Sequence, residues 1–405
     1  MKHRYHVSNV LVIGSGAAGL RAAIAAHESG SDVVIIGKSL KRDAHTVLAA
    51  GGINAALGTN DPQDSWEQHF ADTIKEGYEL SDPRTVELMV QNAPRAIEDL
   101  VSYGVEFAKN ENGDLDQRFF GAHTYRRTCY AGDYTGRAML FGLADKVDEL
   151  RIPILERQYV SQLLVDGGQC FGAFAFDLDT GERTVYLADS VVLAAGGHTR
   201  LWRRSSSRRD ENTGDGMYLA LQAGAELADM ELVQFHPTGM VAPESVAGTL
   251  VTEAVRGEGG RLFNAKGERY MEKYDLDRME LSTRDRIALA NYTEIAEGRG
   301  GPNGGVFLDI SHRDKGFIIE KLPRMYRQFL EHQLMDISKE PMEVAPTAHY
   351  SMGGVVVDPD THMSAVTGLY AAGEVTSRMH GANRLGGNSL AETVVFGRIA
   401  GEAAA

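Results

Sequence analysis

Cysteine and long apolar runs are both scarce in this sequence. The two cysteines among the 405 residues, Cys129 and Cys170, lie far apart and outside any C-x-x-C motif. This argues against a disulfide framework, a thiolate zinc site or a bound iron–sulfur cluster. No apolar run approaches the ~20 residues of a membrane helix, and Val10–Ile13 is too short for the apolar region of a signal peptide. We therefore expect a cytoplasmic protein with no metal site and no membrane span of its own.

Positive charge is also in short supply. Lys and Arg number 41 against 56 Asp and Glu, which gives a formal net charge of −15. A surface this negative repels phosphate backbones and argues against a nucleic-acid partner. An anionic small substrate would need a local cluster of Arg and His. The basic, serine-rich stretch 199–209 (TRLWRRSSSRR) is more typical of a solvated loop than of such a site.

Glycine, in contrast, is abundant, at 45 residues, and falls in short clusters that follow apolar runs. This pattern is typical of α/β proteins with ligand-binding turns. The opening of the chain predicts a strand over Val10–Ile13, a helix over Leu20–Ser29 and a second strand over Val33–Ile36. The turn GSGAAG at 14–19 joins the first strand to the helix, so the segment is predicted to be a βαβ unit.

The glycine turn predicts a dinucleotide site. Gly14 is expected to make the tight turn, Gly16 to let the backbone approach a pyrophosphate, and Gly19 to let helix and strand pack closely. An NAD site usually adds an acidic residue about 20 positions after the glycines, whereas Lys38 and Ser39 follow the second strand here. The missing acid favours FAD.

The expected domain boundaries follow from where strand-and-glycine units occur. Two later segments, 190–197 and 368–374, repeat the pattern, and they fit strands that converge with the opening unit on one long ligand. The interval 238–350 is richer in charge and poorer in such units. We expect residues 1–237 and 351–405 to form the dinucleotide-binding domain and residues 238–350 to be an inserted domain.

Further motifs occur in a fixed order along essentially the whole chain. They are Gly14–Gly19, His45–Thr46, Ala50–Ile53, Thr213–Gly216, Gln234–Thr238, Thr252–Glu253, Arg256–Gly260, Arg284–Asp285, His349–Gly354 and His380–Leu390. As a set they resemble the flavoprotein family of succinate dehydrogenase, fumarate reductase and L-aspartate oxidase. The resemblance implies an α/β fold whose Rossmann-like FAD-binding domain is interrupted by an α+β capping domain. It also implies that the family's C-terminal helical domain is absent, since the sequence stops at Ala405.

The resemblance implies a dicarboxylate oxidoreductase that interconverts succinate and fumarate by hydride transfer at the flavin N5. His236, Thr252, His349 and Arg384 match family positions that bind the substrate carboxylates, a role that suits the planar guanidinium of arginine. Arg284 matches the proton donor to the substrate carbon. A guanidinium is a very weak acid, but the carbon that accepts the proton is carbanion-like and basic enough to take it.

Two further residues, Glu253 and Arg256, match the relay that supplies Arg284 with protons from solvent. In isolation, an E-x-x-R pair on a helix is more typical of a surface ion pair, because residues i and i+3 share a face. The relay is therefore implied by the resemblance and not by the spacing.

The resemblance also implies which residues hold FAD. His45 matches the histidine that carries FAD covalently in succinate dehydrogenases and many fumarate reductases, so we expect a covalent bond there. Asp215 and Glu374 match acids that hold adenosine and ribose hydroxyls, and a helix that starts at Asn388 suits either the pyrophosphate or the N1–O2 region of the reduced flavin. The expected contacts are Gly14, Gly16, Ala17, Gly19, Lys38, Ser39, His45, Thr46, Gly51, Gly52, Ala195, Gly196, Asp215, Glu374, Asn388, Ser389 and Leu390.

Three hypotheses about the function remain open. In the first, the chain works in electron transport and the tricarboxylic acid cycle, passing electrons to a separate iron–sulfur subunit that holds it at the inner face of the membrane. In the second, it is an L-aspartate oxidase, which the run Gly121–Thr128 resembles, although Phe120 stands where that enzyme has a glutamate for the substrate ammonium. In the third, it binds flavin without turnover.

Overall fold

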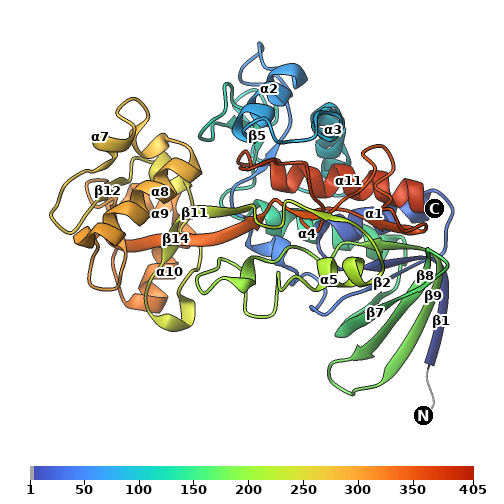
Figure 1. Cartoon of the computed structure of the whole chain (residues 1–405). Helices are drawn as coiled ribbons and strands as arrows, with labels where there is room; N and C mark the ends of the chain where they lie inside the picture. Colours follow the sequence, from blue (N-terminus) through green and yellow to red (C-terminus); the bar gives the residue numbers. More distant parts are fainter. Residues whose placement is uncertain (1–3) are drawn as a thin grey trace.

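The computed structural model describes residues 4–405, so the first three residues of the expected domain 1–237 lie outside the described part. Its largest sheet has seven strands in the order β6-β2-β1-β9-β8-β7, with β16 beside β9 (Figure 1). β1, β2, β6, β9 and β16 are parallel, whereas β8 pairs antiparallel with β7 and β9. The bounds are β1 (Arg4–Ile13), β2 (Val33–Ile36), β6 (Ile154–Leu155), β7 (Gln158–Asp166), β8 (Gln169–Asp177), β9 (Arg183–Leu193) and β16 (Leu369–Ala371).

The strand-and-glycine units of the sequence meet at one edge of this sheet. Val10–Ile13 is the buried end of β1, and the two later units supply the end of β9 and the whole of β16. Because the carboxyl ends of parallel strands share an edge, the glycines that follow them (Gly14, Gly196 and Gly373) are brought together there.

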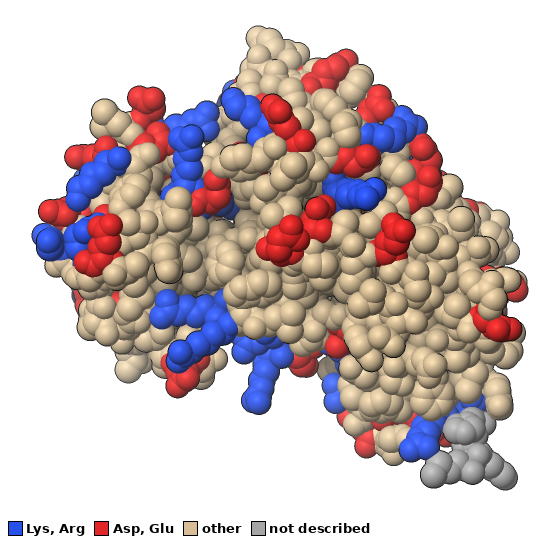
Figure 2. Space-filling model, in the orientation of Figure 1, with Lys and Arg blue, Asp and Glu red and all other residues tan. Residues whose placement is uncertain are grey.

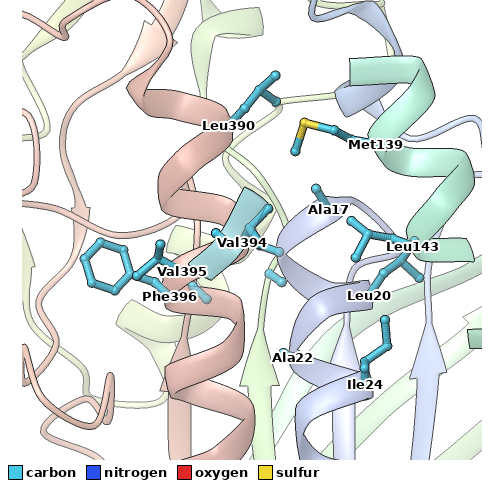
Figure 3. Close-up of a cluster of buried hydrophobic side chains, with 14 of the residues drawn as sticks. Ala17, Leu20, Ala22, Ile24, Met139, Leu143, Leu390, Val394, Val395 and Phe396 are labelled. Atoms are coloured by element: carbon cyan, nitrogen blue, oxygen red, sulfur yellow. The ribbon is translucent and has the colours of Figure 1, made fainter. Parts of the chain in front are cut away.

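Two helices from opposite ends of the chain pack against each other beside this sheet. α1 (Ala17–Glu28) and α11 (Asn388–Ala404) lie side by side, and Figure 3 shows Leu20 and Val394 in the buried cluster between them. The approach is close because a Cβ on Gly401 would come within 2.2 Å of the Ala22 oxygen. α1 begins three residues before the helix predicted over Leu20–Ser29, because the turn needs only residues 14–16 and the Leu20 N–H already bonds to the Gly16 oxygen.

A second, four-stranded antiparallel sheet has its own hydrophobic core, which includes Met240, Leu308 and Phe329. Its strands, in spatial order, are β11 (Val233–Met240), β14 (Met342–Ser351), β13 (Val306–Asp309) and β12 (Arg261–Phe263). Its helices are α6 (Ala254–Gly257), α7 (Met271–Tyr274), α8 (Arg284–Glu294), α9 (Lys315–Lys321) and α10 (Pro323–Gln333). In Figure 1 this unit lies to the left, and β11 and β14 extend from it toward the main body.

The remaining elements are mostly short. They are β3 (Ile53–Asn54), β4 (Gln117–Arg118), β5 (Thr128–Cys129), β10 (Leu227–Ala228), β15 (Gly354–Val355), α2 (Trp66–Glu76), α3 (Pro83–Ser102), α4 (Thr135–Glu149), α5 (Asp215–Gln222), η1 (His45–Leu48), η2 (Thr199–Leu201), η3 (Glu244–Val246), η4 (Met279–Leu281) and the π-helical η5 (Ile295–Arg299). Among residues 4–405, no helix combines the length and apolar character needed to cross a membrane. Both cysteines are buried and form no disulfide.

Candidate functional site

One cavity connects the glycine turn with the four-stranded sheet. Its volume is about 280 Å³. Gly16, Lys38 and Asp215 line one end, and His236 and Arg384 line the other. The cavity therefore spans the expected cofactor and substrate regions.

Most of the expected site residues lie in this lining. They are Gly14, Gly16, Ala17, Lys38, Ser39, His45, Thr46, Gly51, Gly52, Ala195, Gly196, Asp215, His236, Thr252, Glu253, Arg284, His349, Glu374, Arg384, Ser389 and Leu390. Three expected residues lie outside it: Gly19 packs against Gly14, Arg256 lies beside Glu253, and Asn388 is fully buried.

The three glycines of the turn between β1 and α1 have different surroundings. Gly14 has a φ of 121°, and a Cβ there would lie 2.1 Å from the Ala194 oxygen. A Cβ on Gly19 would lie 1.9 Å from the Gly14 oxygen. The nearest atom to a Cβ on Gly16 would be Oγ1 of Thr46, at 3.4 Å, and the cavity lies alongside. Gly14 and Gly19 therefore serve the fold, whereas Gly16 leaves room for a ligand.

This end of the cavity fits the pyrophosphate of FAD. α1 begins here and has no acidic residue in its first turn, so its positive N-terminal end is not neutralised by its own side chains. The Ala17 N–H donates to Oγ1 of Thr46 (3.1 Å), which holds η1 against the start of the helix. Backbone donors and the space beside Gly16 together suit a phosphate group.

An ion pair lies at the end of the cavity where adenosine is expected. Nζ of Lys38 donates to Oδ2 of Asp215 (2.7 Å) and to Oγ1 of Thr213 (2.9 Å). Burial acts to raise the pKa of Asp215, but the hydrogen bonds from Lys38 and Thr213 outweigh it, so the pKa is lowered. The pair is partly exposed, and its carboxylate is ionised at neutral pH.

Glu374 lies deeper in the same region. Its two carboxyl oxygens accept from the Ser351 backbone N–H (3.0 Å) and from Nδ2 of Asn212 (3.1 Å). Burial raises the pKa of Glu374. Its hydrogen bonds fix the carboxyl group beside Gly197, in the segment that follows β9.

His45, on η1, is held by an acidic partner that the motifs did not indicate. Its Nδ1 lies 3.2 Å from Oε2 of Glu211, whose side chain is buried. Burial opposes the charged imidazolium, but the hydrogen bond and charge of Glu211 outweigh it and raise the pKa of His45. Because Nδ1 is engaged, Nε2 is the nitrogen left for a bond to the cofactor.

Two guanidinium groups meet at the other end of the cavity. Nη1 of Arg284, the first residue of α8, and Nη2 of Arg384 both donate to Oε1 of Gln234, at 3.1 and 3.0 Å. Arg384 is only 3% exposed, whereas acidic and basic side chains are interspersed on the face shown in Figure 2. The local cationic cluster that an anionic substrate needs is therefore inside the protein.

Two histidines flank these arginines. The rings of His236 and His349 lie 5.3 Å apart. Burial, and then the positive charge of nearby groups, lowers the pKa of both well below the usual 6.5. The Thr238 backbone N–H donates to Nδ1 of His236 (3.3 Å), and the Ser206 hydroxyl bonds to Nδ1 of His349 (2.8 Å). The neutral rings can donate an N–H to a carboxylate.

Arg256 is buried and the Glu253 side chain is only 12% exposed, so the surface ion pair that their spacing alone predicts is wrong. Glu253 accepts from Nε of Arg284 (2.9 Å) and lies 3.8 Å from Nη2 of Arg256. Burial acts to raise the pKa of Glu253, but the two guanidinium groups lower it to about 2. Arg256 has no exposed side-chain surface, and its Nη1 donates to the Glu280 carbonyl oxygen (2.7 Å).

The start of α11 joins the site to the protein interior. Arg384 donates to Oγ of Ser389 (3.0 Å), which lines the cavity. Asn388 instead bonds to Asn54 and His69, at 2.7 and 2.8 Å, and so anchors the helix from behind.

The stretch 199–209 differs from the expected solvated loop. Ser205 and Ser207 are buried, and Ser206 lines the cavity beside His349. Arg203 and Arg209 are exposed, so these two basic side chains are solvated, as is typical of a charge run.

Sequence reasoning did not assign roles to Gln234, Ser206 or Glu211. Gln234 stands two positions before His236 on β11, and that period-2 spacing was a signal that both side chains share one face. Glu211 lies 166 positions from His45, so no local spacing could have paired them.

Comparisons with known proteins agree with this architecture. A family model described as an FAD binding domain matches residues 9–390. The chain is 49% identical to a fumarate reductase (CoM/CoB) subunit from Methanothermobacter marburgensis, over 100% of this chain and 74% of that protein. It is 41% identical to the succinate dehydrogenase flavoprotein subunit of Rickettsia bellii, over 98% and 69%. The solved E. coli quinol fumarate reductase matches with a TM-score of 0.93 and 37% identity, over 99% of this chain and 70% of that one.

Proposed function

The chain belongs to the family of succinate dehydrogenase and fumarate reductase flavoprotein subunits and is an FAD-dependent oxidoreductase, and from that premise we propose that it interconverts succinate and fumarate. The observation that carries the proposal is the pair of guanidinium groups, Arg284 and Arg384, on the shared oxygen of Gln234. Two cations held this close, one buried and the other with its side chain only 12% exposed, suit a ligand with two carboxylates.

The carboxylates bind to Arg384, His236, His349 and Thr252. Arg384 supplies charge, and the neutral imidazoles and the hydroxyl supply further hydrogen bonds. Phe120 also lines the cavity and offers a ring where an amino acid substrate would need an acid for its ammonium group. That difference favours a diacid without an ammonium group over L-aspartate.

Arg284 transfers the proton. FAD, when bound, supplies the hydride in the direction of fumarate reduction and accepts it in the reverse direction. Nε and Nη1 of Arg284 are engaged by Glu253 and Gln234, which fixes the plane of the guanidinium and leaves Nη2 to face the substrate carbon. Glu253 and Arg256 form the relay that returns a proton to Arg284, and Glu253 is the member that contacts it.

Gly16 and the N-terminus of α1 would hold the pyrophosphate of FAD. Lys38 and Asp215 hold the adenosine end, together with Glu374. His45 carries the covalent bond through Nε2, since Glu211 engages Nδ1.

Residues 238–350 act as a capping domain, and residues 1–237 and 351–405 form the FAD-binding domain. The four-stranded sheet, with a core separate from that of the main body, supports this division. Electrons leave through a separate iron–sulfur subunit, and such partners would hold the chain at the inner face of the membrane. The names of its relatives, which are subunits, support a multi-subunit assembly.

A parallel assay tests the function. The purified, FAD-loaded chain should oxidise succinate with an artificial acceptor dye and reduce fumarate with a reduced viologen dye. Oxidation of L-aspartate without activity on either diacid would overturn the proposal, and binding of FAD without any turnover would favour a non-catalytic flavoprotein. In-gel flavin fluorescence after denaturation tests the bond to His45 separately.

A further inference from the structure

A second, smaller cavity adjoins Arg284. It measures about 10 Å³, roughly the space of one water molecule. Glu253 and Arg284 line it together with Glu76, the last residue of α2. Glu76 belongs to none of the family motifs, yet this cavity joins it to the proposed proton donor and to the carboxylate that supports the donor.

Glu76 lies among buried and charged groups that shift its pKa into the neutral range. It faces Asp285 and Arg284 from α8, Glu253 from the segment before α6, and Arg278 from the segment before η4. Burial, and then the negative charge of Asp285, raises the pKa of Glu76 to about 7. A carboxyl group with this pKa gains and loses a proton with similar ease at neutral pH.

Polar groups continue from Glu76 to the surface. Nδ2 of Asn383 donates to Oε1 of Glu76 (2.7 Å) and to Oδ1 of Asp285 (3.2 Å). Asp285 also accepts from the hydroxyl of Tyr78, whose side chain is exposed. Glu76 is itself only half-buried, so it reaches both solvent and the small cavity.

Arg256 lacks these properties. Its side chain has no exposed surface, and its Nη1 is bonded to the Glu280 carbonyl oxygen. A guanidinium remains charged at neutral pH and is a poor proton donor to a carboxylate. Arg256 is therefore suited to stabilise the charge of Glu253 and not to exchange protons with solvent.

We propose that Glu76 is the solvent-side end of the proton route to Arg284, an inference that rests on the proposed function. During fumarate reduction, an N–H bond of Arg284 breaks as the substrate C–H bond forms. The neutral guanidine regains a proton through Glu253, which receives it from the Glu76 carboxyl by way of a water molecule in the small cavity. Glu76 then takes a proton from solvent. Succinate oxidation reverses each transfer, and no electron moves along the route.

The test compares Glu76→Gln with Glu79→Gln, which changes an exposed carboxylate three residues away. In the unmodified FAD-loaded chain, kcat for fumarate reduction should fall as pH rises through about 7, and kcat for succinate oxidation should rise there. Glu76→Gln should lower kcat about tenfold or more in both directions and remove this inflection, with KM and FAD content unchanged. Glu76→Asp should restore part of both, and Glu79→Gln should change neither.

Infrared spectra give a readout that does not depend on turnover. The difference spectrum between acidic and alkaline samples should contain a protonated-carboxyl band that titrates near pH 7 and is missing from Glu76→Gln. A wild-type kcat and inflection in Glu76→Gln would overturn the route while leaving the function intact. An unmodified chain that turns over neither diacid would overturn both.

Discussion

The two ends of the large cavity are built in different ways. At the glycine end, Gly14, Gly16 and Gly19 stand within one short segment. Gly14 and Gly19 let backbone atoms approach closely, and Gly16 leaves open space. At the other end, Gln234, Arg284 and Arg384 come from three distant segments and act through side chains. The cofactor end therefore depends on the local shape of one backbone segment. The substrate end depends on charged and polar side chains that come together only when distant segments pack.

Removing a charge at the substrate end should have the largest effect on activity. We expect Arg284→Ala to lower kcat for both directions by about 1,000-fold, because the proton donor is lost. FAD binding at the glycine end should not be affected, so FAD content should stay at the wild-type level. Steady-state assays with dye acceptors and donors, together with FAD absorbance, measure both.

Arg286→Ala is the matched control, because Arg286 lies on the same helix with its side chain 63% exposed. It should keep wild-type kcat. If Arg284→Ala lowered the FAD content and left kcat per bound FAD unchanged, the substrate end and the cofactor end would not act independently.

Two glycine substitutions distinguish a glycine that the fold needs from a glycine that FAD binding needs. Gly19→Ala should destabilise the FAD-free chain by about 3 kcal/mol, because its Cβ would clash with backbone. Gly16→Ala should leave the free energy of unfolding unchanged. Made together with His45→Ala so that affinity can be measured, it should weaken FAD binding about tenfold, because its Cβ would project into the pyrophosphate space. Urea unfolding and fluorescence titration measure the two quantities. Equal destabilisation by both substitutions would contradict the distinction.

The covalent bond should depend on His45 alone. His45→Ala should abolish the in-gel fluorescence of denatured protein while leaving FAD bound in the native state. Succinate oxidation should fall more than fumarate reduction, because a covalent bond generally raises the flavin potential. His27→Ala, on the far end of α1, should keep the fluorescence. Fluorescence that survives His45→Ala would assign the bond elsewhere.

The smallest effect is expected at the partly exposed Lys38–Asp215 pair. Asp215→Asn, made together with His45→Ala so that affinity can be measured, should weaken FAD binding about threefold. Because the pKa of Asp215 is lowered, the His45→Ala chain should keep its affinity as pH falls until below the usual aspartate range. A loss of affinity already near neutral pH would show that another group is responsible.

Local sequence patterns predicted the parts of the molecule that are local. The glycine turn and the strands at 10–13 and 33–36 follow from spacing and apolar runs. The starts differed: β1 begins at Arg4, before the predicted strand, and α1 begins at Ala17, before the predicted helix. The start of α11 at Asn388 was likewise expected, because it follows directly from a motif.

The partners of the site residues were not predictable in the same way. Glu211 supports His45 and Glu76 adjoins Arg284 only because distant segments pack together. The sequence also could not show that Glu253 and Arg256 are shielded from solvent, because an E-x-x-R spacing is the same on a surface helix as in the interior.

The contact between α1 and α11 has a consequence for biogenesis. α1, which begins at the proposed pyrophosphate site, packs against α11 (residues 388–404). The FAD-binding domain is therefore not complete until those residues have emerged from the ribosome. Until then the face of α1 that packs against α11 lacks that partner, and we expect FAD insertion to follow translation of α11.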